Sequence, residues 1–279
     1  MLESKQQIDI WSEGRTVGSV DFLQKYKFNE VPEKLRPIVN AVHGLSCVEL
    51  DVSGPNLSLP EERLIRIFAR RYKGVQCKVT RLGGGLSGTK VVRLRIQDAS
   101  GALLQDAVAK FGKLTDIRDE AARFNAHVSR LEPKATPRGL ATLEFGAGPV
   151  AGMFYGLATG FDVTAFDLAF NEDGKARLAV QGIASTTSRW RDGVPQSRRT
   201  IAEVRRRALT DKDAAAVVTK FGPEWATAFE AKEIQTRWAC IHGDLHGSNA
   251  LIAPDGTAVL IDYGDVGEGA ASLDPVTLE

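Results

Sequence analysis

The sequence predicts an α+β protein with a smaller lobe built on antiparallel strands and a larger, mainly helical lobe. Three observations point to this fold class. Short apolar strands follow one another between residues 75 and 111, helical spacing dominates residues 160–238, and a strand hairpin occupies residues 250–261. Strands and helices gathered in separate runs are typical of α+β proteins.

Length and composition limit the possible classes of protein. A chain of 279 residues has room for one bilobed catalytic domain or for two modest domains. With 43% hydrophobic and 25% charged residues, it is not a disordered, collagen-like or coiled-coil chain. Lysine and arginine number 36 against 35 acidic residues, so the charge of a nucleic-acid coat protein is absent and we expect no nucleic-acid partner.

The cysteines and the apolar runs indicate the cellular compartment of the protein. Cys47, Cys77 and Cys240 are widely spaced and form no C-x-x-C, which argues against a disulfide framework and against a zinc site. The amino-terminal residues lack the apolar segment of a signal peptide, and no apolar run approaches the ~18 residues of a membrane span. We therefore expect a cytoplasmic protein without a membrane partner.

The first clear helix starts at Ser58. Residues 1–57 show no helical period, so we treat them as an amino-terminal extension of unknown fold. Ser58 and Glu61 have the spacing of a capping box, and apolar residues at helical spacing follow as far as Gly74. The smaller lobe is predicted to begin here and to extend over residues 58–157.

Alternating apolar residues predict a five-stranded antiparallel sheet in this lobe. A glycine-rich connection, residues 83–88, joins the first two strands, and Thr115 can cap a helix after the third strand. The predicted strands are residues 75–79, 92–96, 107–111, 140–145 and 153–157.

The larger lobe is predicted to comprise residues 158–279. Helices are expected at residues 200–208, 211–221 and 223–234. Pro254-Asp255-Gly256 then separates two apolar strands and predicts a tight hairpin. The basic run Arg205-Arg206-Arg207 is expected to be a solvated face, with a docking surface for an acidic partner as the alternative.

The densest polar cluster surrounds this hairpin. His242, Asp244 and Asn249 precede its first strand, and Asp262 follows its second strand. Carboxylate and amide oxygens fixed at the ends of one hairpin suit Mg²⁺, which takes oxygen ligands in octahedral geometry. Any one of these residues could instead cap a turn, but their joint spacing favours a metal site.

The motif H-x-D-x-x-x-x-N at His242, Asp244 and Asn249, with D-x-G at Asp262, resembles the protein-kinase-like superfamily. Within it, the H-G-D form resembles the aminoglycoside/choline phosphotransferase-like branch, which lacks the arginine of H-R-D. The resemblance implies that Asp244 accepts or orients the proton of an attacking hydroxyl. It also implies that Asn249 and Asp262 hold the Mg²⁺ that bridges the nucleotide phosphates.

The glycine-rich connection fits the same family. It reads G-x-G-x-x-G between two strands and not at a strand-to-helix junction, so a dinucleotide-binding loop does not fit. The resemblance implies a loop that covers the phosphates of ATP. Its nucleotide-binding residues would be Gly83, Gly84, Gly85, Ser87 and Gly88.

Four further residues complete the expected nucleotide site. Lys110 ends the third strand in A-V-A-K, and Glu120 lies on the following helix. By resemblance, these two would form an ion pair that presents the ammonium to the α- and β-phosphates, while Tyr155 and Leu157 would lie in the segment that binds adenine. Taken alone, Lys110 could be a strand-end lysine with a solvated head, and Glu120 a solvated acid.

The function implied is Mg·ATP-dependent transfer of the γ-phosphoryl group to a hydroxyl, most simply of a small molecule; GTP stays open as the donor. A protein Ser/Thr kinase would use the same residues. A nucleotide-binding signalling module with weak catalysis, a pseudokinase, is the third possibility.

The end of the chain adds a narrower resemblance. Relatives carry more helices after the residue that corresponds to Asp262, so we expect a large lobe truncated at its carboxyl end. The segment LDPVTLE resembles kinase-like domains of bacterial ternary-complex-associated signalling or conflict proteins. That resemblance implies a protein partner or additional domains. Asp274-Pro275, in the same segment, resembles the acid that follows the metal-binding motif in relatives and helps to order the loop there, and it is assigned no catalytic role.

Overall fold

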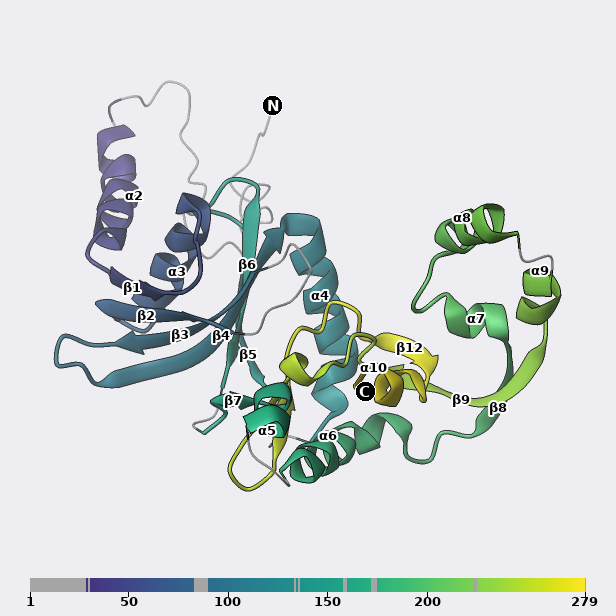
Figure 1. The fold of residues 1–279 in the computed structure, drawn as a ribbon. Helices are drawn as coiled ribbons and strands as arrows, with labels where there is room; N and C mark the ends of the chain where they lie inside the picture. Colours follow the sequence, from purple (N-terminus) through teal and green to yellow (C-terminus); the bar gives the residue numbers. More distant parts are fainter. Residues whose placement is uncertain are drawn as a thin grey trace. The chain divides into compact units, whose positions relative to one another are not determined.

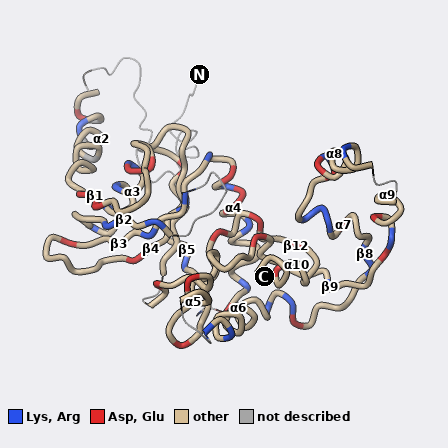
Figure 2. The backbone as a smooth tube through the Cα atoms, viewed as in Figure 1, with Lys and Arg blue, Asp and Glu red and all other residues tan. Residues whose placement is uncertain are grey.

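The computed structural model describes Asn29 and residues 31–82, 90–132, 134, 136–157, 160–171, 175–222 and 225–278. The chain forms two compact units. The first comprises residues 1–121 and 138–159, and the second comprises residues 122–137 and 160–279. Figure 1 shows the elements of both units, and Figure 2 shows basic and acidic residues interspersed along the chain, as the balanced composition implies.

The first unit is built on one mixed sheet with three helices. Its strands are β1 (Glu49–Ser53), β2 (Gln76–Arg81), β3 (Lys90–Gln97), β4 (Leu103–Lys113), β5 (Arg138–Leu143) and β6 (Val150–Gly156). Its helices are α2 (Val31–Leu45), α3 (Leu59–Arg71) and the first half of α4 (Leu114–His127), which continues into the second unit.

The sheet has six strands, one more than the sequence predicts. Their order is β1-β2-β3-β4-β6-β5, and β1 runs parallel to β2 while the other neighbours are antiparallel. Four of the five residues of β1 are exposed, so the strand carries no alternating apolar pattern. Its pairing with β2 is a tertiary interaction that local periodicity could not reveal.

Helix α3 closes one side of this sheet. The Ser58 N–H donates to Glu61 Oε2 at 2.6 Å, as the capping-box pattern predicts. Lys90 Nζ of β3 lies 2.8 Å from the same Glu61 oxygen. Burial alone would raise the pKa of Glu61, but these hydrogen bonds and the Lys90 charge hold it below its usual value. Phe68 stacks on Phe154 of β6 with 4.1 Å between the ring centroids, which anchors the helix in the core.

The second unit contains two small sheets and several helices. Its strands are β7 (Val163–Thr164), β8 (Gln196–Thr200), β9 (Glu233–Ile241), β10 (Ala250–Ile252), β11 (Ala258–Leu260) and β12 (Gly267–Ala270), in the orders β11-β10-β7 and β12-β9-β8. Its helices are η2 (Val128–Arg130), α5 (Ala165–Asn171), α6 (Ala176–Arg191), α7 (Ile201–Arg205), α8 (Asp211–Phe221), α9 (Trp225–Glu230), η3 (Gly247–Asn249) and α10 (Leu273–Leu278).

Residues 160–238 are expected to be mostly helical, but besides the two-residue strand β7 they contain β8 and most of β9. Residues 196–200 form β8 and residues 233–241 form β9, paired antiparallel over five residues of β8. The sequence of β8, QSRRT, has no apolar alternation, so only its partner strand shows its conformation. The two strands carry α7, α8 and α9 at their far end (Figure 1). We call residues 196–237 the arm.

The predicted hairpin is present. Strands β10 and β11 pair antiparallel from Ala250 opposite Leu260 to Ile252 opposite Ala258. The Gly256 N–H donates to the Ala253 carbonyl oxygen at 2.9 Å and closes the turn. All six residues of the two strands are buried, so the hairpin gives the residues at its open end a rigid base. Within the described part of the chain, no helix has the length and apolar character needed to cross a membrane.

Candidate active site

The loop between β9 and β10 begins with a completely buried histidine. His242 Nε2 lies 3.0 Å from the Ile261 carbonyl oxygen, so this ring nitrogen carries the proton. Burial lowers the pKa of His242, which keeps the ring neutral. The ring also lies 5.6 Å from that of Tyr263, centroid to centroid. These contacts fit a packing and hydrogen-bonding residue better than an acid–base group.

Asp274 holds the backbone of the same loop. Its Oδ2 accepts the His242 N–H at 2.8 Å, and its Oδ1 accepts the Gly243 N–H at 3.0 Å. The residue lies near the start of α10 and is 2% exposed. Resemblance to relatives implies that this acid helps to order the loop, and these two hydrogen bonds, made to residues about thirty positions earlier in the chain, are consistent with that expectation.

Asp244 presents an accessible carboxylate from this fixed loop. Its side chain is 54% exposed, with His246 Nε2 3.9 Å from its Oδ2. Its carbonyl oxygen accepts the His246 N–H at 3.1 Å and the Asn249 side-chain amide at 2.9 Å. A carboxylate that is solvent-accessible but fixed at its backbone is suited to accept a proton from a bound hydroxyl.

Asn249 and Asp262 lie at the open end of the hairpin. The Ile261 N–H donates to the Asn249 carbonyl oxygen at 2.9 Å, so Asp262 follows directly after the residue that faces Asn249. Asp262 has a φ of 64°, a left-handed conformation that turns the chain away from β11 at this point. Asn249 is 7% exposed and uses its amide nitrogen for Asp244, which leaves the amide oxygen for a cation.

This donor set fits Mg²⁺ with a nucleotide. Among the described residues, no group of three or more His, Cys, Asp or Glu could hold a metal ion. One amide oxygen and one carboxylate are nonetheless suitable ligands, because Mg²⁺ commonly takes one or two protein groups and completes its shell with phosphate and water oxygens.

In the first unit, the structure brings Lys110 and Glu120 together. Lys110 Nζ of β4 lies 2.7 Å from Glu120 Oε2 of α4, and the side chains are 7% and 3% exposed. The Tyr155 hydroxyl lies 3.2 Å from Glu120 Oε1 and donates to it. A lysine held this way by a buried acid has a fixed position, and an ammonium group there can bind phosphate oxygens.

The segment expected to bind adenine is only partly described. Tyr155 is buried, and its side chain serves Glu120. The Leu157 N–H donates to the Asp106 carbonyl oxygen at 3.2 Å, so this donor is already used. The structure does not describe residues 158 and 159.

The glycine-rich residues 83–88, including Gly83, Gly84, Gly85, Ser87 and Gly88, lie outside the described residues. The strands on either side are antiparallel, with Arg81 opposite Val92. The connection therefore joins two strands of one sheet, as the sequence pattern predicts.

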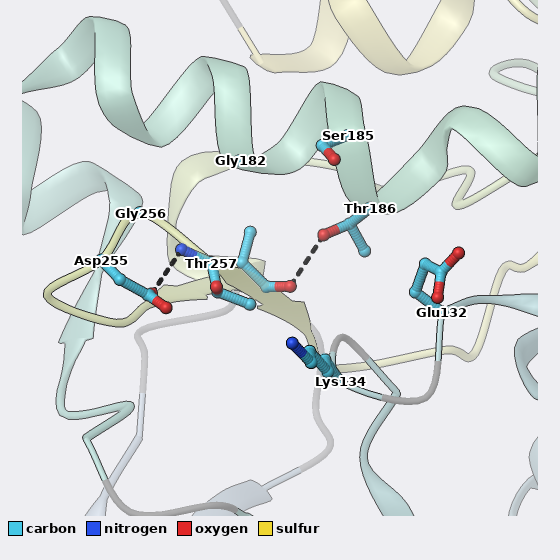
Figure 3. Close-up of a pocket in the computed structure, with 9 residues that line it drawn as sticks. Glu132, Lys134, Gly182, Ser185, Thr186, Asp255, Gly256 and Thr257 are labelled. Atoms are coloured by element: carbon cyan, nitrogen blue, oxygen red, sulfur yellow. Dashed lines mark hydrogen bonds between the residues drawn. The ribbon is translucent and has the colours of Figure 1, made fainter.

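A separate hollow of about 410 Å³ lies where the hairpin turn meets α6 (Figure 3). Thr186 Oγ1 donates to the Ala258 carbonyl oxygen at 2.8 Å and fastens the helix to the hairpin. Three exposed side chains line the hollow, those of Glu132, Lys134 and Asp255. None of the predicted site residues lines this hollow.

Together these features define a class of protein: a kinase-like phosphotransferase, with a strand lysine paired to a helix acid and an H-x-D-x-x-x-x-N loop before a hairpin. The chain belongs to the phosphotransferase enzyme family (APH), whose family profile matches residues 66–278. The enzyme class and the α+β fold class expected from the sequence are thereby confirmed. A comparison with curated proteins found no match.

Solved structures of aminoglycoside phosphotransferases are similar to this chain at low identity. An apo thermostable mutant of aminoglycoside phosphotransferase APH(4)-Ia shares 15% identity with a TM-score of 0.43, and the match covers 68% of each chain. The GDP and kanamycin complex of APH(2")-IIIa shares 19% identity with a TM-score of 0.43, and the match covers 72% of this chain and 73% of that one.

Proposed function

We propose that this protein transfers the γ-phosphoryl group of Mg·ATP to a hydroxyl group of a small molecule. The observation that carries the proposal is the hydrogen bond between the Asn249 side-chain amide and Asp244, 2.9 Å to the carbonyl oxygen. It links a residue suited to hold the metal directly to the residue suited to accept the hydroxyl proton. Phosphoryl transfer needs these two functions side by side.

In this proposal Asp244 orients the attacking hydroxyl and accepts its proton. Its exposed carboxylate supports the role, because an acceptor can reach it from solvent. Asn249 and Asp262 would hold Mg²⁺, which supplies positive charge to the phosphate oxygens as the transferring group leaves. His242 and Asp274 fix the backbone on which Asp244 stands.

The first unit would contribute the nucleotide-binding groups. Lys110, held in place by Glu120, would bind the α- and β-phosphates and neutralise charge that develops in the transition state. The glycine-rich connection would cover the phosphates. Because the Leu157 N–H is already bonded to Asp106, adenine binding at Leu157 would use its carbonyl oxygen or its side chain.

The function is tested first by ligand binding and then by turnover. Melting temperatures are measured with ATP and with GTP, each with and without Mg²⁺; stabilisation that requires both nucleotide and metal is the expected result. Radiolabelled ATP is then incubated with a metabolite panel and with generic protein substrates. Label on a metabolite supports the proposal, whereas label only on protein indicates a protein kinase. Binding without any turnover indicates a signalling module.

Two substitutions separate the chemical roles. Asp244→Asn is expected to lower kcat by ~10²-fold or more with little change in Mg·ATP affinity, because a proton-orienting group acts mainly in the transition state. Asp262→Ala is expected to abolish the Mg²⁺-dependent part of nucleotide binding. Asp255→Asn, in the turn of the same hairpin, is the control that leaves both quantities unchanged. If Asp262→Ala binds Mg·ATP as well as the parent, the metal assignment is wrong.

A further inference from the structure

Three consecutive arginines in the arm have different surroundings. Arg205 Nε lies 2.7 Å from Glu230 Oε1, and its Nη2 lies 2.8 Å from Asp211 Oδ1. Arg206 Nε lies 3.0 Å from Asp211 Oδ2. These ion pairs link the helices of the arm; the Arg205 side chain is 17% exposed, whereas that of Arg206 is 51% exposed and thus largely solvated. The side chain of Arg207 instead extends out of the arm to the loop that follows Asp262. The three arginines form the basic stretch after α7 in Figure 2.

The Arg207 side chain lies across glycines of the catalytic loop and of β12. Its Nη2 donates to the Asp265 carbonyl oxygen at 2.5 Å. A Cβ at Gly243 would lie 2.9 Å from this nitrogen, and one at Gly269 would lie 3.4 Å from Arg207 Cγ. At Gly267 the closest approach would be 3.8 Å, to both Nη atoms. The glycine of H-G-D thus leaves room for a guanidinium supplied by a different element.

The loop after Asp262 is held at two successive carbonyl groups. Arg123 of α4 donates to the Gly264 carbonyl oxygen, and Arg207 donates to that of Asp265. The Asp265 carbonyl also lies against Gly243, so close that a Cβ there would collide with its oxygen. Arg207 therefore lies where the loop that carries Asp244 meets the loop that leaves Asp262.

We propose that Arg207 is a positioning residue for phosphoryl transfer. It fixes the proton acceptor and the metal ligand relative to each other, and it does so from the arm. The inference rests on the proposed function for its catalytic consequence. Guanidinium is suited to this task because it stays charged and presents several N–H donors in a fixed plane. Within the described residues its Nε has no hydrogen-bond partner, so the Nη groups make the connection.

The structural part of the proposal is tested without nucleotide. Hydrogen exchange is followed in peptides covering residues 242–246 and 263–268, in the parent, in Arg207→Ala and in Arg206→Ala. Faster exchange in both peptides of Arg207→Ala, and parent-like exchange in Arg206→Ala, is expected. Arg206 is the matched control because it has the same charge and its ion pair, with Asp211, lies within the arm. Unchanged exchange in Arg207→Ala would overturn the proposal, whatever the activity.

The catalytic part is tested through ATP turnover, with water as the acceptor where no other is known. Arg207→Ala is expected to lower kcat by ~10²-fold while Mg·ATP affinity changes far less, since small misplacements cost mainly orientation. Ethylguanidinium in the millimolar range is expected to restore part of the activity of Arg207→Ala but not of Asp244→Asn. Arg207→Lys should show intermediate turnover. A loss of kcat without rescue, matched by an equal loss of affinity, would mean a general structural role.

The two proposals fail in different ways. If the parent neither binds nor turns over Mg·ATP, the proposed function fails, and the exchange experiment still decides whether Arg207 joins the two loops. If the parent is active and Arg207→Ala is equally active, the function stands and the positioning role is wrong.

Discussion

The most consequential single contact in the first unit is the ion pair between Lys110 and Glu120. Both side chains are almost completely buried, so the attraction between the two charges has to offset the hydration that each loses on burial. The Tyr155 hydroxyl adds a second partner for Glu120. Arg118 and Glu144 form a contrasting pair in the same unit, in which the arginine is half exposed.

Removing the ammonium should therefore destabilise the protein strongly. In Lys110→Met the Glu120 carboxylate stays buried without its cation, and the free energy of unfolding is expected to fall by about 3–5 kcal/mol. Arg118→Met is the matched control and should change it little, because water screens that pair. Urea denaturation at pH 7 measures both. Equal losses in the two variants would show that the Lys110 pair is no better insulated than a surface pair.

Residue types and spacing were sufficient to find Lys110, Asp244, Asn249 and Asp262 as candidates. Arg207 could not be found in this way, and Asp274 was indicated only by the resemblance to relatives. Each acts on backbone groups distant in the sequence, and a hydrogen bond to a backbone amide or carbonyl places no requirement on the residue type at the other end.

At the scale of elements, the hairpin β10–β11 is the part most clearly specified by local sequence. Gly256 has a φ of 86°, a conformation that side chains with a Cβ rarely adopt. A Cβ there would also lie 2.6 Å from Leu178 Cδ1 of α6. The turn therefore needs glycine for its backbone and for its packing.

Gly256→Ala should lower the free energy of unfolding by about 2–3 kcal/mol, of which about 1 kcal/mol is the backbone strain. Gly101→Ala isolates that strain, because Gly101 has a φ of 83° and a Cβ added there would meet no atom within 4 Å. It should cost about 1 kcal/mol. Urea denaturation of the two variants gives the difference, and equal losses would mean that Leu178 moves aside freely.

Strands β8 and β9 show where local pattern is insufficient. An exposed ribbon buries little apolar surface, so it shows neither the alternation of a half-buried strand nor the period of an amphipathic helix. Its conformation comes from pairing between strands that are separated by the three helices of the arm. The same holds for β1, which is identified as a strand only by its parallel partner β2.

At the scale of the whole molecule, two histidines, the buried His242 and the partly buried His127, couple stability to pH. Burial lowers the pKa of His242 below the usual 6.5, and burial also lowers that of His127. The unfolded chain takes up protons as the pH falls through 6.5, whereas the folded chain does not until a lower pH. Stability is therefore highest above pH 6.5 and decreases as the pH falls below it.

For His242 the expected decrease approaches ~1.4 kcal/mol per pH unit below 6.5. The free energy of unfolding is measured at several pH values between 5.5 and 7.5 for the parent, His242→Gln and His43→Gln. His242→Gln should show a shallower decrease, and His43→Gln, which changes an exposed residue, should follow the parent. A parent-like slope in His242→Gln would show that other groups cause the acid sensitivity.

The sequence by itself determined the α+β class, the strands on either side of the glycine-rich connection, the hairpin and the residues that could carry phosphoryl transfer. These depend on local periodicity, on turn chemistry and on the few residue types that can bind phosphate, metal and protons. The tertiary structure alone decided that β1 joins the sheet, that β8 and β9 form a ribbon, and that Arg207 reaches the catalytic loop. Those features arise from hydrogen bonds between distant segments, where the backbone of one segment meets a side chain or a strand of another.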